Sequence, residues 1–198
     1  MECLANIQNI NENGKLYDFN GNKIKEIENS NDRTCFIDTF FDNESSKNYI
    51  ITGNYSYSKS YEYNEDKIYH MYNDNDQQNH YSIVISTNKG ITQMIESSED
   101  GNIRIWNFHS GILLKKIKIG NDCLFGISLW NNEYLFIGCE DKTIELIELD
   151  RGINAKNLIK HRNNVLTIKT IIHPKYGKCL ISQGFANDQI RLWGIKII

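Results

Sequence analysis

A short pattern of turn residues followed by an alternating strand recurs along the chain at nearly constant spacing. Its best copy is Ser97–Asn107, SSEDGNIRIWN, in which a turn at Glu99–Asn102 leads into a run that ends at Trp106. Asp and Asn accept local backbone hydrogen bonds and Gly tolerates positive φ, so this stretch favours a tight turn. Alternating β-branched residues and an aromatic residue then predict a strand. The repeated unit is therefore expected to be a pair of strands joined by a turn.

The same pattern can be placed on four other parts of the chain, with one bulky residue as the anchor of each copy. The anchors are Tyr17, Tyr61, Trp106, Ile147 and Trp193, and they are 44, 45, 41 and 46 residues apart. A period near forty residues indicates a repeat architecture, in which each copy folds as one unit and stacks on the next.

These copies resemble the repeats of the WD-repeat β-propeller family, which carry Gly-His near the start and Trp-Asp near the end. The end pair reads Tyr17-Asp18, Tyr61-Glu62, Trp106-Asn107, Ile147-Glu148 and Trp193-Gly194. The start pair survives as Asn79-His80 and Lys160-His161, with Gly120-Asn121 at the third site. The resemblance covers nearly all of the chain. It implies an all-β fold, a β-propeller of four-stranded antiparallel blades with about four to five blades present, open or partial.

The repeat positions predict one propeller domain over residues 1–198. A partial blade would occupy residues 1–29, and blades would follow at about 30–73, 74–119, 120–161 and 162–198. The chain would begin with a strand at Leu4–Ile10, and the last blade would lack its outer strand. Unpaired strands expose backbone groups that pair readily with another chain, so we expect self-association through these open edges.

The resemblance also implies a hydrogen-bonded group inside a blade, formed by a His, a strand Ser or Thr, a turn Asp and the Trp. One copy is expected to assemble all four members, and they are His80, Ser98, Asp100 and Trp106. Structural roles are expected as well for Asp141, His161 and Trp193. The copy with Asp141 has Gly120 and Ile147 at the other positions, so it would depend on packing alone.

The composition supports β structure and indicates an intracellular protein, cytoplasmic or nuclear. The chain has 31 Ile and one Pro, and its 26 Asn and 13 Gly supply turn residues. It lacks the apolar run of a membrane span and the basic, apolar start of a secretion signal. Five widely spaced Cys suggest buried thiols and not a disulfide framework.

The sequence offers no catalytic constellation, so we expect a protein that is not an enzyme and needs no cofactor or metal. The five His are scattered, and no phosphate-binding Gly-rich loop is present. The run Asn73–Asn79, NDNDQQN, lacks the Gly and Glu of a calcium loop, and we interpret it as a solvated loop.

The function predicted from these observations is a non-catalytic scaffold that binds one or more protein partners. Loops on a rigid scaffold are where binding residues usually lie. In the family the loops before each first strand and between the second and third strands meet at one end of the propeller. The residues expected to meet a partner there are Tyr81, Glu99, Asn121, Asp122, Glu140, Arg162, Asn163 and Asn187.

Two other function classes stay open at this point. Residues 1–100 carry a net charge of −9 and residues 101–198 carry +6, so the basic half could bind nucleic acid. We do not expect nucleic acid to be the main partner, because the tyrosine-rich stretch suited to base stacking lies in the acidic half. The chain could also be the targeting region of a larger enzyme.

Overall fold

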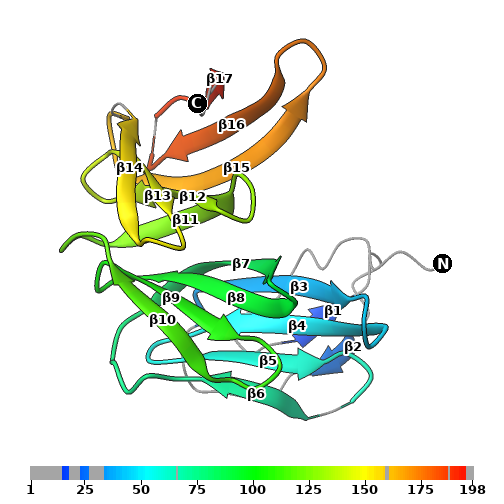
Figure 1. The fold of residues 1–198 in the computed structure, drawn as a ribbon. Helices are drawn as coiled ribbons and strands as arrows, with labels where there is room; N and C mark the ends of the chain where they lie inside the picture. Colours follow the sequence, from blue (N-terminus) through cyan, green and yellow to red (C-terminus); the bar gives the residue numbers. More distant parts are fainter. Residues whose placement is uncertain are drawn as a thin grey trace.

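The computed structural model describes residues 15–17, 23–26, 34–65, 67–158, 161–186 and 188–194, and these residues form strands and turns with no helix among them. The strands pair in chain order into antiparallel sheets, which are arranged as the blades of a β-propeller (Figure 1). This arrangement confirms the predicted fold class. The strand expected at Leu4–Ile10 lies outside the described residues.

Three of the sheets have four strands each. The first contains β3 (Phe36–Asp42), β4 (Lys47–Gly53), β5 (Ser58–Glu62) and β6 (Ile68–Tyr72). The second contains β7 (His80–Asn88), β8 (Ile91–Ser98), β9 (Asn102–Asn107) and β10 (Leu113–Lys118). The third contains β11 (Leu124–Leu129), β12 (Tyr134–Cys139), β13 (Ile144–Glu148) and β14 (Ile153–Leu158).

The remaining described strands form two smaller sheets. The last sheet contains β15 (Val165–His173), β16 (Gly177–Gly184) and β17 (Arg191–Gly194). At the start of the chain, β1 (Lys15–Tyr17) pairs with β2 (Lys23–Glu26). Among the described residues, β17 has a pairing partner on one side. Self-association through open edges stays a prediction.

The turn between β7 and β8 shows how local sequence sets a strand pair. Asn88 pairs with Ile91, so Lys89 and Gly90 are the two residues of the loop. Both have positive φ, 50° and 76°, as a type I′ turn requires. Gly adopts this conformation without steric cost, and the twist of such a turn matches the twist of the flanking strands. The short Asn-Lys-Gly sequence therefore fixes the register of the hairpin.

The hydrophobic core is divided into clusters that lie between neighbouring sheets. Between the first and second sheets, Tyr49 and Tyr72 pack against Met94, Trp106 and Phe108. Between the second and third sheets the cluster is aliphatic and includes Ile95, Ile105, Leu135, Ile137 and Ile147. Between the third and last sheets it contains Phe136, Ile144, Leu146, Val165, Ile168 and Leu180. Each sheet is thus held mainly by its neighbours along the chain.

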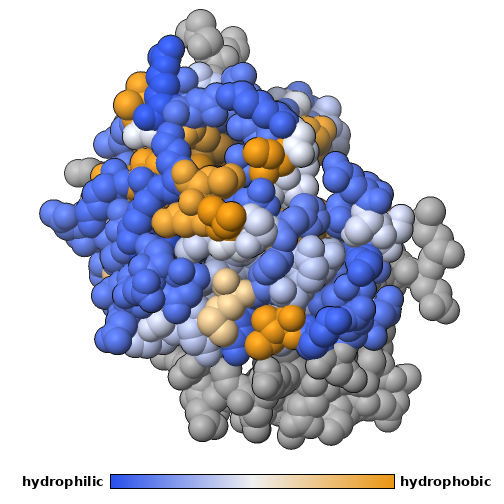
Figure 2. All heavy atoms as spheres, turned by 60° about the horizontal axis from the view of Figure 1, so that its bottom comes forward, coloured by the Kyte–Doolittle hydropathy of each residue, from blue (hydrophilic) through white to orange (hydrophobic). Residues whose placement is uncertain are grey.

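One face of the molecule is mainly hydrophilic (Figure 2). Figure 2 shows a face of the molecule on which hydrophobic side chains form separate patches among polar ones. Ile112 and Leu114, near and on β10, are 62% and 43% exposed, and Met71 on β6 is 49% exposed. Single exposed apolar side chains are common on soluble proteins, so these positions need no special function.

The inner strands of the third and last sheets, β11 and β15, approach each other closely at Gly126. A Cβ atom at this position would lie 2.7 Å from the carbonyl oxygen of Leu166 and 3.0 Å from the backbone nitrogen of Ile168. Both neighbours are backbone atoms of the β15 strand, which cannot rotate away as a side chain can. The absence of a side chain at residue 126 is therefore a condition for packing the last two sheets together.

We expect Gly126→Ala to lower the free energy of unfolding by about 1–3 kcal/mol, the usual cost of overpacking. Gly194→Ala is the matched control, because a Cβ there would have nothing within 4 Å. Urea denaturation of both variants measures the difference. Equal stability of the two variants would show that β11 and β15 are not packed this closely.

Candidate functional site

The predicted partner-binding residues lie at one end of the sheets, which we call the loop end. The loop end is formed by the connections before β7, β11 and β15 and by the β8–β9 and β12–β13 turns. Tyr81, Glu99, Asn121, Asp122, Glu140, Arg162 and Asn163 all lie there, and Asn187 lies outside the described residues. Neighbouring loops are in contact at this end, because a Cβ on Gly101 would lie 2.3 Å from the carbonyl oxygen of Gly120.

Three of these residues have internal roles in the structure. The Tyr81 ring packs against Phe125 of the next sheet, with ring centroids 5.1 Å apart. The Glu99 carboxylate accepts a hydrogen bond of 2.6 Å from the Asn79 side-chain amide. The Asn163 amide donates to the carbonyl oxygen of Phe185 at 3.1 Å. Asn121, Asp122, Glu140 and Arg162 are exposed and form the outer part of the loop end.

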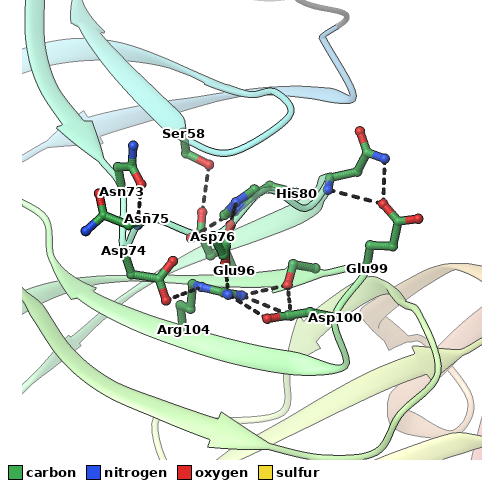
Figure 3. A network of polar contacts seen from close by, with 12 residues as sticks. Ser58, Asn73, Asp74, Asn75, Asp76, His80, Glu96, Glu99, Asp100 and Arg104 are labelled. Carbon is green, nitrogen blue, oxygen red and sulfur yellow. Dashed lines mark hydrogen bonds and ion pairs between the residues drawn. The ribbon is translucent and has the colours of Figure 1, made fainter.

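A buried carboxylate, Glu96, organises the polar interior of the second sheet (Figure 3). Its Oε1 accepts a hydrogen bond of 2.7 Å from the indole nitrogen of Trp106 and lies 3.1 Å from Nδ1 of His80. Its Oε2 accepts a hydrogen bond of 2.7 Å from the hydroxyl of Ser58, on the neighbouring sheet. All four side chains are buried. Glu96 therefore connects strands β7 and β9 and also ties the second sheet to the first.

The guanidinium of Arg104 lies beside this group and is fully buried (Figure 3). Its Nε donates to Asp74 at 3.0 Å, and its Nη2 donates to Asp100 at 2.7 Å and also to Asp76. Its Nη1 donates to the hydroxyl of Ser98 at 2.6 Å. A buried charge is stable only when paired and hydrogen-bonded, and here the pairing is complete. Arg104 thereby fastens the loop that carries Asp74 and Asp76 to strand β9.

This arrangement corrects the interpretation of Asn73–Asn79 as a solvated loop for its two acids, whereas Asn73, Asn75 and Gln77 are exposed. Asp74 and Asp76 have side chains that are 10% and 13% exposed, and both pair with Arg104. Desolvation acts to raise the pKa of Asp74, but hydrogen bonds from Lys116 and Arg104 and the Arg104 charge lower it. The acids of this loop serve as internal counterions of the second sheet.

His80 lies between two carboxylates in the same network. Nε2 of His80 is 3.4 Å from Asp76, on the side opposite to Glu96. Burial acts to lower the pKa of His80, but the Glu96 charge and hydrogen bond, with smaller effects of Asp74 and Asp100, raise it above the usual value. Protonation of His80 is therefore easier than protonation of a free histidine.

The expected His, Ser, Asp and Trp group is not assembled by His80, Ser98, Asp100 and Trp106. Ser98 and Asp100 bind Arg104, whereas His80 and Trp106 meet at Glu96. Strand register explains the difference, because Met94 lies opposite Trp106 and Glu96 lies two residues further along β8. Glu96 thus takes the strand position that the prediction gave to Ser98.

The complete group occurs instead in the last sheet. His161 donates or accepts through both ring nitrogens, at 3.0 Å to the Asp188 carboxylate and at 2.7 Å to the Ser182 hydroxyl. The Trp193 indole nitrogen donates to the same hydroxyl at 2.7 Å. Leu180 lies opposite Trp193, so Ser182 holds the position that Glu96 holds in the second sheet. The sequence prediction included His161 and Trp193 but missed Ser182 and Asp188.

The third sheet uses a simpler arrangement. Asp141, in the β12–β13 turn, accepts hydrogen bonds from the backbone nitrogen and the hydroxyl of Thr143, at 3.0 Å and 2.5 Å. Ile147 is fully buried in the aliphatic cluster that this sheet shares with the second one. The turn acid therefore stabilises its own turn, and apolar packing holds the sheet to its neighbour.

Several ionisable groups of the described residues take part in packing and pairing. Burial raises the pKa of the Cys139 thiol to about 12, and burial together with Glu140 raises that of Cys123 to about 12. Both thiols are protonated at neutral pH, which disfavours nucleophilic chemistry. No group of three or more His, Cys, Asp or Glu side chains suited to a metal ion occurs in the described part of the chain. No helix there is long and apolar enough to cross a membrane.

No protein-family model and no curated protein sequence matches the chain. Among solved structures it is similar to the WD40 β-propeller domain of Doa1, with a TM-score of 0.70 and 16% identity over 86% of this chain and 53% of that one. U3-55K is similar with a TM-score of 0.69 and 13% identity, over 85% of this chain and 51% of that one. The computationally designed Ika8 protein is similar with a TM-score of 0.68 and 14% identity, over 93% of this chain and 54% of that one.

These likenesses show the fold alone, because the identities are low and one fold hosts many functions. The chain spans about half the length of each of these three structures. The Doa1 domain is a WD40 β-propeller, in line with the repeat spacing found in the sequence.

Trp106→Ala should lower the free energy of unfolding by about 3–5 kcal/mol, the usual cost of truncating a large buried aromatic side chain. Trp106 is 1% exposed, and its loss would leave one oxygen of Glu96 without its indole donor. Ile147→Val, at the anchor position of the third sheet, is the control and should cost about 0.5–1.5 kcal/mol. Similar values for both variants in urea denaturation would contradict the role of Trp106.

Asp188→Asn should destabilise the protein at neutral pH and much less in acid. Desolvation acts to raise the pKa of Asp188, but backbone hydrogen bonds from Gln189, Arg162 and Asn163 lower it to about 2. Since an aspartate in an unfolded chain titrates at about 3.9, the stabilisation is present above that pH and is lost as the pH falls towards 2. Urea denaturation of the wild type and Asp188→Asn from neutral pH down to acid measures this loss. A difference in unfolding free energy that does not change with pH would contradict the role given to Asp188.

Proposed function

We propose that the protein is a non-catalytic β-propeller scaffold that binds a protein partner through the loop end. The supporting observation is the contrast between buried and exposed polar groups at that end. Arg104 pairs with three acids of this end, Asp74, Asp76 and Asp100. Other charged side chains there are exposed, and they are Asp122, Glu140 and Arg162. The buried pairs make the loops rigid, and the exposed charges are what a partner would meet.

The exposed charges are held in place by backbone hydrogen bonds. The Glu140 carboxylate accepts from the backbone nitrogen of Cys123 at 3.2 Å, next to Asp122. The backbone nitrogen of Arg162 donates to the buried Asp188 at 2.8 Å, which leaves the Arg162 side chain pointing into solvent. Rigid loops lower the entropy cost of binding. Acidic and basic side chains stand on neighbouring sheets, so a protein surface of mixed charge fits this end better than a phosphate backbone does.

The test combines Asp122→Ala with Arg162→Ala in the full chain. A partner captured from native lysate by the wild-type protein should bind this double variant at least about tenfold more weakly, since two central charged contacts are lost. The matched control combines Lys89→Ala with Asp150→Ala, an exposed acid and base 3.6 Å apart at the opposite end of the sheets. Both double variants should keep the wild-type melting temperature.

Unchanged binding of the Asp122 and Arg162 double variant would exclude the loop end as the interaction surface. Loss of binding in the Lys89 and Asp150 control would move the surface to the other end. Loss of partner binding on changing Tyr63, which follows β5, would instead place the interaction surface on the side of the first sheet.

A further inference from the structure

The stretch from Arg151 to Asn187 is unusual in its charge. It contains seven Lys and Arg residues and no Asp or Glu. Most of the last sheet, including all of β15 and β16, comes from this stretch. Elsewhere in the structure some basic side chains are paired with acids of the same or a neighbouring sheet, as Arg104 and Lys116 are with Asp74. The basic side chains of β15 and β16 have no acid near them in sequence.

The β15–β16 hairpin carries this charge away from the rest of the sheet. Its strands pair up to His173 and Gly177, whereas within the described residues β17 pairs with Cys179–Ser182 of β16. The hairpin tip therefore extends beyond β17 (Figure 1). We define the hairpin tip as Ile172, His173, Lys175, Tyr176 and Lys178. It lies at the end of the sheets opposite to the loop end.

Local interactions hold the hairpin tip in one conformation. Nδ1 of His173 accepts hydrogen bonds from the backbone nitrogens of Lys175 and Tyr176, at 3.1 Å and 3.2 Å. The His173 ring stacks on Tyr176, with centroids 4.7 Å apart and planes inclined by 22°. Gly177, which pairs with His173 at the base of the loop, has a φ of 71°, a conformation that Gly adopts without steric cost. A loop ordered in advance loses little entropy when it binds.

Aromatic rings position both lysines of the hairpin tip. The Lys175 ammonium lies 5.3 Å from the centre of the Tyr176 ring, and the Lys178 ammonium lies 4.9 Å from that of Trp130, on the third sheet. Cation–π contacts of this kind attract the ammonium without neutralising it. Beside them, Ile172 is 76% exposed and Tyr176 is 58% exposed. The tip therefore offers two fixed positive charges next to an aliphatic side chain.

We propose that the hairpin tip is a second docking surface, which binds an acidic peptide segment carrying an aliphatic side chain. The carboxylates would pair with Lys175 and Lys178, and the aliphatic side chain would cover Ile172. A peptide fits better than single-stranded nucleic acid, because base stacking needs open ring faces. Here the Tyr176 ring already contacts His173 and Lys175, and the Trp130 ring contacts Lys178. This inference goes beyond the proposed function, since it concerns the opposite end of the sheets.

The test measures binding of a short fluorescein-labelled peptide of Glu and Gly with a central Leu, by fluorescence anisotropy at low salt. Lys175→Glu combined with Lys178→Glu should weaken binding by about tenfold or more. Lys142→Glu combined with Lys156→Glu is the control, because these exposed lysines change the net charge equally but lie elsewhere. The affinity of the control variant for the peptide should stay within about twofold of the wild-type affinity, because distant charges are screened by salt.

Two further measurements test the remaining parts of the proposal. Ile172→Thr should weaken binding of the Leu peptide and leave binding of the same peptide with Gly in place of Leu unchanged. The loop-end double variant, Asp122→Ala with Arg162→Ala, should bind the Leu peptide as the wild type does. A circular dichroism spectrum of each variant is the check that the variant is folded.

The proposal is overturned if the two lysine double variants lose equal affinity, since binding would then follow net charge alone. Absence of peptide binding by the wild type overturns it as well. Tighter binding of a single-stranded oligothymidine of similar charge, with loss on Tyr176→Ala, would assign the hairpin tip to nucleic acid instead.

Discussion

The burial of the Arg104 guanidinium is the interaction on which the polar interior depends. An uncompensated charge at a fully buried position would cost several kcal/mol, so Asp74, Asp76 and Asp100 must all be close by. Two of these acids come from the loop that links the first and second sheets, and the third comes from the β8–β9 turn. Pairing the Arg104 guanidinium therefore holds the connection between the first two sheets and the β8–β9 turn against strand β9. These contacts set the positions of two of the loops at the loop end.

Three sheets meet the same structural need with different chemistry. Each must join its third strand to the strands beside it. The second sheet uses two buried charges, Glu96 bound to Trp106 and Arg104 paired with aspartates. The last sheet uses Ser182 between His161 and Trp193. The third sheet has Ile147 in the apolar cluster and limits its polar contacts to the turn. Charged and neutral groups can thus serve the same structural position when they are hydrogen-bonded within the protein.

The sequence predicted the fold well because the anchors recur at one place in every sheet. Tyr61, Trp106, Ile147 and Trp193 all lie on a third strand, so their spacing reports the repeat directly. The polar partners were harder to predict. Choosing Glu96 over Ser98 needs the register of β8 against β9, and Asp74 reaches Arg104 from 30 residues away. A pattern of residue types shows which positions alternate, but it does not show which acid from a distant loop will reach a buried base.

The division of the core into separate clusters has a consequence for how such a chain can change in evolution. The three clusters described above each involve two adjacent sheets, so the energetic coupling between sheets is mainly between nearest neighbours, as in solenoid proteins. Duplicating or deleting one sheet would create or remove a single interface and leave the others unaltered. Architectures coupled in this way tolerate changes in copy number, whereas a fold with one central core would have to be rebuilt for each change.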